Sequence, residues 1–139
     1  MVETTGGCAC GAVRWVHIGN FIRHLVCHCE SCRRAVSAGC SAFVGTREAD
    51  VSWHGEFARY KSSPEAVRGF CAECGTQLFF KSTRWPGELH LHVGTLDDAS
   101  GYVPDKHVVL AERVAWLPLA DGIARDKGFH LNPAGSQDG

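Results

Sequence analysis

Seven of the eight cysteines in this chain of 139 residues fall into three short clusters. The clusters are Cys8-Ala9-Cys10, Cys27-His28-Cys29-Glu30-Ser31-Cys32 and Cys71-Ala72-Glu73-Cys74. Thiolates at such close spacing can share one metal ion, and zinc accepts four of them in a tetrahedral site at about 2.3 Å. The clusters therefore predict a protein that binds zinc, through one four-cysteine site and one three-cysteine site.

The first and third clusters are complementary halves of the four-cysteine site. Each half is followed directly by a glycine, Gly11 or Gly75, which lets the backbone turn tightly enough for its amide groups to face the sulfurs. Because the two halves lie far apart in the sequence, we expect this zinc to be structural and to join the first strand region to the segment before residues 77–81. The expected ligands are Cys8, Cys10, Cys71 and Cys74.

The middle cluster is compact and differs from the other two. It places three thiolates, Cys27, Cys29 and Cys32, on one short segment. The fourth position on the metal is then left for water, a substrate or another side chain, an arrangement that is typical of catalytic zinc. We do not expect His28 to be a ligand, because it should point away from its neighbours in an extended segment.

Other readings of these cysteines stay open at this point. A fourth ligand such as Cys40 or a histidine would close the middle site and make it structural; otherwise Cys40 is expected to be a plain buried thiol. Disulfides are disfavoured in a reducing compartment and by the strained rings of Cys-x-Cys pairs. The spacings match neither ferredoxin pattern of iron–sulfur ligands. A middle site without metal, used for redox sensing, would leave about one zinc per chain.

The bulk composition narrows the class of protein. The formal net charge of −1 argues against a strong nonspecific nucleic-acid or membrane partner. No apolar run is long enough to cross a membrane, and the first residues do not resemble a signal peptide, so we expect a cytoplasmic protein. The length favours one domain, over residues 1–131, followed by a disordered tail at residues 132–139 that has no apolar anchor.

Strand signals dominate the rest of the chain. Alternation of β-branched, aromatic and polar residues predicts strands at 11–17, 40–44, 51–53, 57–61, 67–70, 77–81 and 88–93, and a β-rich run at 107–116. Helical periodicity is thin, with one short helix or turn expected at 30–36. The sequence therefore predicts a mainly β domain of short antiparallel strands with long loops, held together by zinc.

Three histidines are candidates for a function without a firm role. In the strand at 88–93, Leu89 and Leu91 alternate with His90 and His92, which share the other face. These two histidines either line a pocket or are exposed polar positions on a half-buried strand. His107 is either a proton shuttle or a structural histidine whose nitrogens are hydrogen bonded.

With these motifs in place, the chain resembles the glutathione-dependent formaldehyde-activating enzyme family, also called the CENP-V/GFA domain, which has an Mss4-like fold. The resemblance covers roughly residues 5–125. The segments that carry it are Gly7-Cys8-Ala9-Cys10-Gly11, Cys27-His28-Cys29-Glu30-Ser31-Cys32-Arg33-Arg34, Phe70-Cys71-Ala72-Glu73-Cys74-Gly75-Thr76, Val93-Gly94-Thr95-Leu96-Asp97-Asp98, Pro104-Asp105-Lys106-His107 and Ala115-Trp116-Leu117. In the last segment the family often has a proline where this chain has Ala115.

The resemblance implies two zinc ions per chain and a carbon–sulfur lyase. Cys8, Cys10, Cys71 and Cys74 match the family's structural ligands, and Cys27, Cys29 and Cys32 match its catalytic ligands. The family's named reaction joins glutathione and formaldehyde to S-hydroxymethylglutathione, so a small-molecule thiol and an aldehyde are the implied partners. The alternative is a non-catalytic zinc-binding Mss4-like module that binds a protein partner.

Two arginines follow the last cysteine of the middle cluster. Three thiolates on one divalent ion give a net charge of −1, which weakens the ion as a Lewis acid and disfavours a further anionic ligand. Arg33 and Arg34 could offset this charge by hydrogen bonding the sulfurs, or could hold a substrate carboxylate. The other reading is that they are solvated surface arginines. We expect Trp53, Trp85 and Trp116 in the core or in a pocket wall.

Overall fold

A computed structural model of the chain describes residues 2–119 and 121–131. The prediction of a mainly β protein is confirmed, with strands in two sheets. The smaller sheet is antiparallel and has the order β1 (Glu3–Gly7), β2 (Arg14–Ile18), β5 (Val51–His54). The larger sheet has the order β11 (Ala124–Arg125), β10 (Lys106–Val108), β3 (Arg23–Cys27), β4 (Ser41–Arg47), β9 (Glu88–His92), β8 (Gln77–Ser82), β7 (Ala66–Phe70), β6 (Ala58–Ser63).

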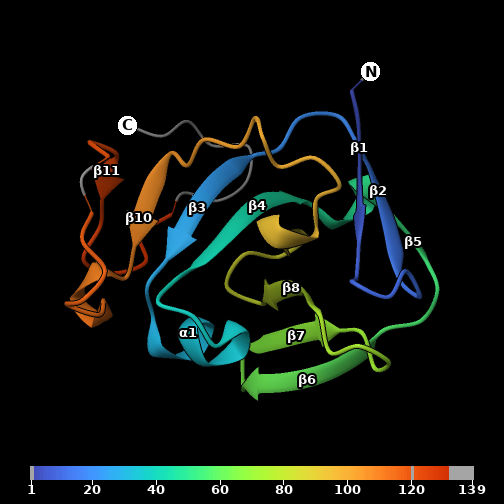
Figure 1. Cartoon of the computed structure of the whole chain (residues 1–139), viewed down its shortest axis with the longest axis horizontal. Coiled ribbons are helices and arrows are strands. Elements are labelled where there is room, and N and C mark those ends of the chain that lie inside the picture. The colour runs from blue at the N-terminus through green and yellow to red at the C-terminus, as the bar shows by residue number, and fades with distance from the viewer. Residues whose placement is uncertain (1, 120, 132–139) are drawn as a thin grey trace.

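The larger sheet is antiparallel from β3 to β6, whereas β10 pairs in parallel with both β3 and β11. Figure 1 shows this sheet curving from β10 and β3 through β4 to β7 and β6, with the smaller sheet to the right of it. Short 3-10 turns lie at Glu48–Asp50, Val93–Thr95 and Leu110–Glu112. The helix α1 (Glu30–Val36) connects β3 to β4, so the middle cysteine cluster lies where strand β3 gives way to a helix.

The core lies on both faces of the larger sheet. One cluster of buried side chains includes Trp15 of β2 and Leu91 of β9, and it fills the space on the side of the smaller sheet. A second cluster includes Leu25, Phe43 and Val108. Cys8 and Cys71 belong to the first cluster, and Cys27 and Cys32 to the second. The two predicted metal sites are therefore parts of different cores.

Strand β9 shows why the two faces matter. All five of its residues are buried, with Leu89 and Leu91 in the first core and His90 and His92 packed beside Phe43 on the opposite face. The reading of these histidines as exposed polar positions is therefore wrong: they are 3% and 5% exposed. A strand that is covered on both faces has no solvent side, so its polar residues must be buried too.

The local predictions vary in accuracy. The helix at 30–36 is confirmed at both ends, and most strands begin and end within a few residues of their prediction. The β-rich run at 107–116 is wrong for most of its length, because the strand ends at Val108 and a 3-10 turn follows. Trp116 is also not a core residue, since it is 70% exposed. The predicted tail at 132–139 lies outside the described residues.

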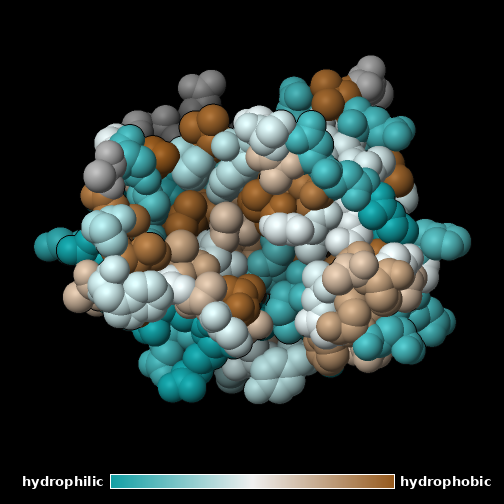
Figure 2. Space-filling model, in the orientation of Figure 1, coloured by the Kyte–Doolittle hydropathy of each residue, from teal (hydrophilic) through white to brown (hydrophobic). Residues whose placement is uncertain are grey.

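The surface has no single dominant feature on the face that Figure 2 shows. Hydrophobic residues lie in small groups, some around the middle of that face and others near its upper edge and sides, separated by neutral and hydrophilic residues. Among the described residues, no helix has the length and apolar character needed to cross a lipid bilayer.

Candidate metal centres

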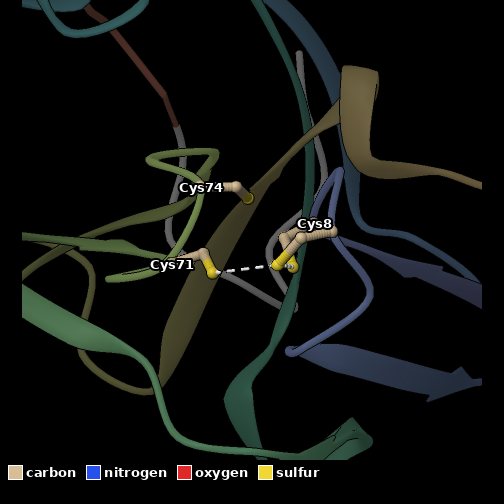
Figure 3. Close-up of side chains that lie close together, drawn as sticks. Cys8, Cys71 and Cys74 are labelled. Atoms are coloured by element: carbon tan, nitrogen blue, oxygen red, sulfur yellow. Dashed lines mark hydrogen bonds between the residues drawn. The ribbon is translucent and has the colours of Figure 1, made fainter.

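The four-cysteine site forms as the sequence predicts. The sulfurs of Cys8, Cys10, Cys71 and Cys74 all lie within 4.8 Å of one another. Figure 3 shows the side chains of Cys8, Cys71 and Cys74 pointing toward a common centre. The Cys10 sulfur lies 3.6 Å from that of Cys8 and 3.8 Å from that of Cys71. A tetrahedron with zinc–sulfur bonds of about 2.3 Å has sulfur–sulfur edges of about 3.8 Å, so the donor set fits zinc.

The two halves of this site are tight turns that end on glycine. Gly11 and Gly75 have φ angles of 82° and 80°, in the left-handed region that other residues rarely adopt. In each turn the glycine N–H donates to the carbonyl of the first cysteine, at 3.2 Å for Cys8 and 2.8 Å for Cys71. The backbone after each cysteine pair therefore has the tight turn that the sequence predicted, and its φ angle explains why a glycine stands there.

Thr76 links the two halves without being a ligand. Its hydroxyl accepts a hydrogen bond from the N–H of Ala9 at 3.1 Å and lies 3.1 Å from the sulfur of Cys74. The hydroxyl and the backbone N–H of Thr76 lower the pKa of Cys74 to about 5. Thr76 therefore favours the thiolate that a metal requires, and it holds the first turn against the second.

The three-cysteine site is built at the junction of β3 and α1. Cys27 is the last residue of β3, Cys29 caps the helix, and Cys32 lies in its first turn. The three sulfurs lie within 4.8 Å of one another. Among the described residues, no further cysteine, histidine or carboxylate completes this cluster. Cys40 is half-buried and belongs to neither cluster, and burial raises the pKa of its thiol.

Helix α1 begins at this site because of the sulfur itself. The sulfur of Cys29 accepts the N–H of Cys32 at 3.2 Å, which satisfies one of the free donors of the first turn. The side chain of Glu112 accepts the N–H of Glu30 at 2.9 Å and satisfies another. A helix N-terminus also carries a partial positive charge, which favours thiolates beside it.

The thiols of this cluster differ in acidity. Hydrogen bonds from Cys27 and Cys32 lower the pKa of Cys29 to about 2, and the backbone N–H of Cys32 and the charge of Arg68 act in the same direction. The same hydrogen bonds to neighbouring sulfur raise the pKa of Cys27, and burial adds to that rise.

Arg68 is the buried cation of the three-cysteine site, and sequence reasoning missed it. It is 3% exposed, and its Nη2 donates to the hydroxyl of Ser31 at 2.9 Å and to the sulfur of Cys32 at 3.5 Å. Its guanidinium lies 5.0 Å from the centre of the Phe80 ring. The Nη1 atom is buried and has no hydrogen-bond partner within residues 2–119 and 121–131. The sequence shows only that an arginine stands inside the strand predicted at 67–70, and it gives no sign that this arginine is buried beside the cysteines.

The two predicted arginines lie farther from the sulfurs. Arg33 donates to the carbonyls of His28 and Glu112, each at 3.3 Å. Arg34 is exposed and pairs with Glu30 at 2.9 Å. Their contacts therefore hold the helix and the loop after β10. A role for Arg33 or Arg34 toward a substrate stays a prediction.

His28 is not part of the cysteine cluster, as expected. Its Nε2 lies 2.9 Å from Nδ1 of His107, and Nε2 of His107 lies 2.8 Å from a carboxylate oxygen of Asp121. Both nitrogens of His107 are therefore hydrogen bonded, which fits the structural reading of this residue. Burial lowers the pKa of His28 to about 4, with the charges of His107 and nearby arginines adding to the effect.

A cavity of about 490 Å³ opens beside the three-cysteine site. This volume is in the range of small-molecule sites. The three cysteines, Arg68 and His90 lie on its wall with Phe80 and Trp85. Residues 128–130 form another part of the wall, and the rings of Phe129 and Trp85 lie 4.7 Å apart. The compact cluster thus faces a space that can hold a ligand, whereas the four-cysteine site does not line it.

Comparisons with known proteins agree with this arrangement. The profile of the family described as "Glutathione-dependent formaldehyde-activating enzyme" matches residues 3–112. An "uncharacterized lyase C29B12.13" of Schizosaccharomyces pombe is 39% identical over 83 residues, which cover 60% of this chain and 61% of that protein. A crystal structure of a Rhodobacter sphaeroides protein has the same fold, with a TM-score of 0.59 and 24% identity over 72% of this chain and 97% of that one. The family match covers all seven clustered cysteines, and the chain belongs to the glutathione-dependent formaldehyde-activating enzyme family.

Proposed function

We propose that this chain is a zinc-dependent carbon–sulfur lyase-type enzyme that joins a thiol to an aldehyde and splits the adduct. Glutathione and formaldehyde are the first pair to test, because the matched family is described by them. The name of the S. pombe relative supports a lyase, although the matched region spans only 61% of that protein. In this proposal Cys8, Cys10, Cys71 and Cys74 hold a structural zinc, and Cys27, Cys29 and Cys32 hold a catalytic one.

The observation that carries the proposal is the open side of the three-cysteine cluster. Three sulfurs lie on the wall of a cavity, and the described residues supply no fourth ligand. Zinc bound there would offer a fourth position at which a thiol is deprotonated or an aldehyde oxygen is polarised. A site that only held the fold together would be closed by a fourth protein ligand.

Arg68 compensates the negative net charge that zinc and three thiolates would give this site. Three thiolates and one divalent cation sum to −1, and the guanidinium beside Cys32 brings the local sum to zero. This correction comes from within the core, where interactions between charges are screened less than at the surface. The site then repels a further anionic group, such as the thiolate of a substrate, less strongly.

The cavity wall supplies groups suited to a peptide-like thiol. Arg84 is exposed at the cavity and lies 4.9 Å from the ring of Trp85, where it can pair with a carboxylate of glutathione. The aromatic side chains of Phe80 and Phe129 add apolar surface to the cavity wall. In the addition, a bond forms between sulfur and the carbonyl carbon, the π electron pair moves to oxygen, and that oxygen takes a proton. Cleavage is the reverse, and neither direction needs an oxidant or a reductant.

The test is exchange of 13C-labelled formaldehyde between its free form and its glutathione adduct, followed by NMR magnetisation transfer. The zinc-loaded protein should accelerate exchange above the spontaneous rate. Cys29→Ser should lose one zinc per chain and the acceleration, while Cys40→Ser, a cysteine outside both clusters, should keep both. A protein with two zinc ions and no effect on exchange would contradict the proposal and favour a zinc-binding module that binds a protein partner.

A further inference from the structure

Three buried ionisable side chains form a row that ends at the cavity. Arg23 of β3, Glu88 of β9 and His90 of β9 are 6%, 2% and 3% exposed. Oε1 of Glu88 lies 2.8 Å from Nε2 of His90 and also contacts Nε of Arg23. Oε2 of Glu88 accepts from Nη2 of Arg23 at 3.0 Å. The row therefore runs from an arginine, through a carboxylate, to a histidine ring.

His90 is the member of this row that lines the cavity with the cysteines. Its ring stacks on Trp85 with centroids 6.1 Å apart and lies 6.0 Å from the rings of Phe43 and Phe80. Strand pairing places it opposite Phe80 in the register of β8 and β9. The ring is therefore held by neighbours on several sides and by Glu88 behind it.

The hydrogen bond of His90 to Glu88 fixes which ring nitrogen carries the hydrogen. A carboxylate only accepts, so Nε2 of His90 donates to Glu88 and carries a hydrogen. Nδ1 has no hydrogen-bond partner among the described residues, and it is not among the buried atoms that lack one. The lone pair of Nδ1 is therefore not engaged by any described residue, and the ring that carries it lines the cavity.

Glu88 is ionised behind this ring. Burial alone would raise the pKa of Glu88, but hydrogen bonds from His90 and Arg23 outweigh burial and lower that pKa to about 2. An ionised carboxylate that accepts from one histidine nitrogen orients the ring and fixes which nitrogen carries the hydrogen. This is the arrangement that a base needs when it takes a proton from a substrate.

We propose that His90 carries the proton between thiol and aldehyde in the reaction, and that Glu88 is its positioning residue. The inference rests on the proposed function. In the addition, the thiol proton passes to Nδ1 as the sulfur bonds to the carbonyl carbon. The π electron pair moves to the carbonyl oxygen, and Nδ1 returns the proton to that oxygen. The imidazole ends as it began, and cleavage runs through the same transfers in reverse.

Several charged groups surround the ring and share in any dependence on pH. Besides Glu88 and Arg23, they are Arg68 on β7, His92 on β9, and Glu65, Arg84, Glu112 and His130 around the cavity. Burial and the charges of Arg68 and His90 lower the pKa of His92 to about 3, so His92 stays neutral near pH 7. The contribution of His90 must therefore be taken as the difference between wild-type and variant profiles.

His90→Gln is the decisive variant. The glutamine amide can still donate to Glu88, so the buried hydrogen bond is kept, but it has no nitrogen that accepts a proton. We expect kcat to fall by about 10²- to 10⁴-fold, the range for loss of a general base, with a much smaller change in KM for glutathione. The pH dependence of kcat that wild type shows should flatten in the variant. His54→Gln, an exposed histidine on β5 of the smaller sheet, is the matched control and should behave as wild type.

A second readout does not depend on turnover. In zinc-loaded protein labelled with 15N-histidine, the His90 resonances are assigned by their loss in His90→Gln. They should show a hydrogen on Nε2, none on Nδ1, and a shift of Nδ1 when glutathione is added. Glu88→Gln should weaken that preference for a hydrogen on Nε2, because a neutral amide oxygen is a poorer acceptor than a carboxylate.

The outcomes separate the two proposals. If wild type accelerates exchange and zinc-loaded His90→Gln keeps its kcat and pH profile, the role of His90 is wrong and the proposed function stands. If the 15N spectra show the hydrogen on Nδ1 of His90 and no shift on adding glutathione, the role of His90 is likewise wrong and the proposed function stands. If wild type itself does not accelerate exchange, the proposed function fails and the role of His90 fails with it, before any variant is compared.

Discussion

Replacing Arg68 by methionine tests the idea that a buried cation sets the metal affinity of the three-cysteine site. Methionine keeps much of the apolar stem against Phe80 but removes the guanidinium that donates to Cys32 at 3.5 Å and to Ser31 at 2.9 Å. A hydrogen bond to a charged group contributes about 1.5–3 kcal/mol, and losing such a partner of a metal ligand weakens metal binding by about 10- to 100-fold. We therefore expect zinc at this site to bind about 10- to 100-fold more weakly.

The loss of stability caused by Arg68→Met should be much smaller when metal is absent. In the metal-free protein Arg68 is a buried cation whose Nη1 has no hydrogen-bond partner among the described residues. Removing an uncompensated buried charge costs little and can stabilise. Arg68→Met should thus reduce the rise in melting temperature on zinc binding without lowering the melting temperature of the metal-free protein to the same extent.

The assay is stepwise removal of zinc by a chromophoric chelator, with the four-cysteine site of the same molecule as an internal reference. Arg59→Met is the matched control, since Arg59 also stacks on a phenylalanine, Phe57 at 4.9 Å, but is exposed on β6. If Arg68→Met loses zinc no more easily than Arg59→Met, the charge argument for the three-cysteine site is wrong.

Three further predictions concern stability. Cys74→Ser should lower the melting temperature of zinc-loaded protein much more than Cys29→Ser, because the four-cysteine site joins distant segments and structural zinc is worth on the order of 10 kcal/mol; equal losses would contradict the division into structural and catalytic sites. The pKa of Glu88 is lowered from 4.5 to about 2, so its ionised form stabilises the fold fully above pH 4.5, and this contribution disappears as pH falls through 2. The difference in unfolding free energy between wild type and Glu88→Gln should therefore shrink from pH 4.5 to pH 2. A difference that stays constant over this range would refute the prediction. A methyl group at Gly69 would meet the Phe79 ring at 2.0 Å, so Gly69→Ala should destabilise by about 1–3 kcal/mol in denaturant unfolding, whereas Gly94→Ala, which meets no atom, should not.

The sequence was most informative where chemistry and local spacing coincide. The two cysteine sets could be predicted because cysteines in one turn lie close together in any fold, and Gly11 and Gly75 marked the turns. Helix α1 could be predicted for the same reason, since its start depends on Cys29 and its neighbours. The cysteines within each cluster are therefore brought together by local structure. The pairing of the first and third clusters is the one long-range step among the described residues.

What could not be predicted depends on long-range packing. Arg68 meets Cys32 only because β7 lies beside α1 in the folded chain, and nothing near position 68 in the sequence indicates this contact. The burial of His90 required knowing that β9 lies inside the larger sheet with both faces covered. The cellular location, the Mss4-like relationship and the roles of Arg33 and Arg34 stay predictions.

The wall that residues 128–130 give to the cavity has a consequence for how substrate range can change. This segment lies outside the part of the chain that matches the family, which ends at residue 112, yet Phe129 packs on Trp85 beside the reacting space. Substitutions there would reshape the cavity wall while leaving all seven clustered cysteines in place, although Phe129 also packs against the core cluster that contains Cys27 and Cys32. Exchanging this one segment between relatives is thus a way to vary the shape of the cavity separately from the seven clustered cysteines.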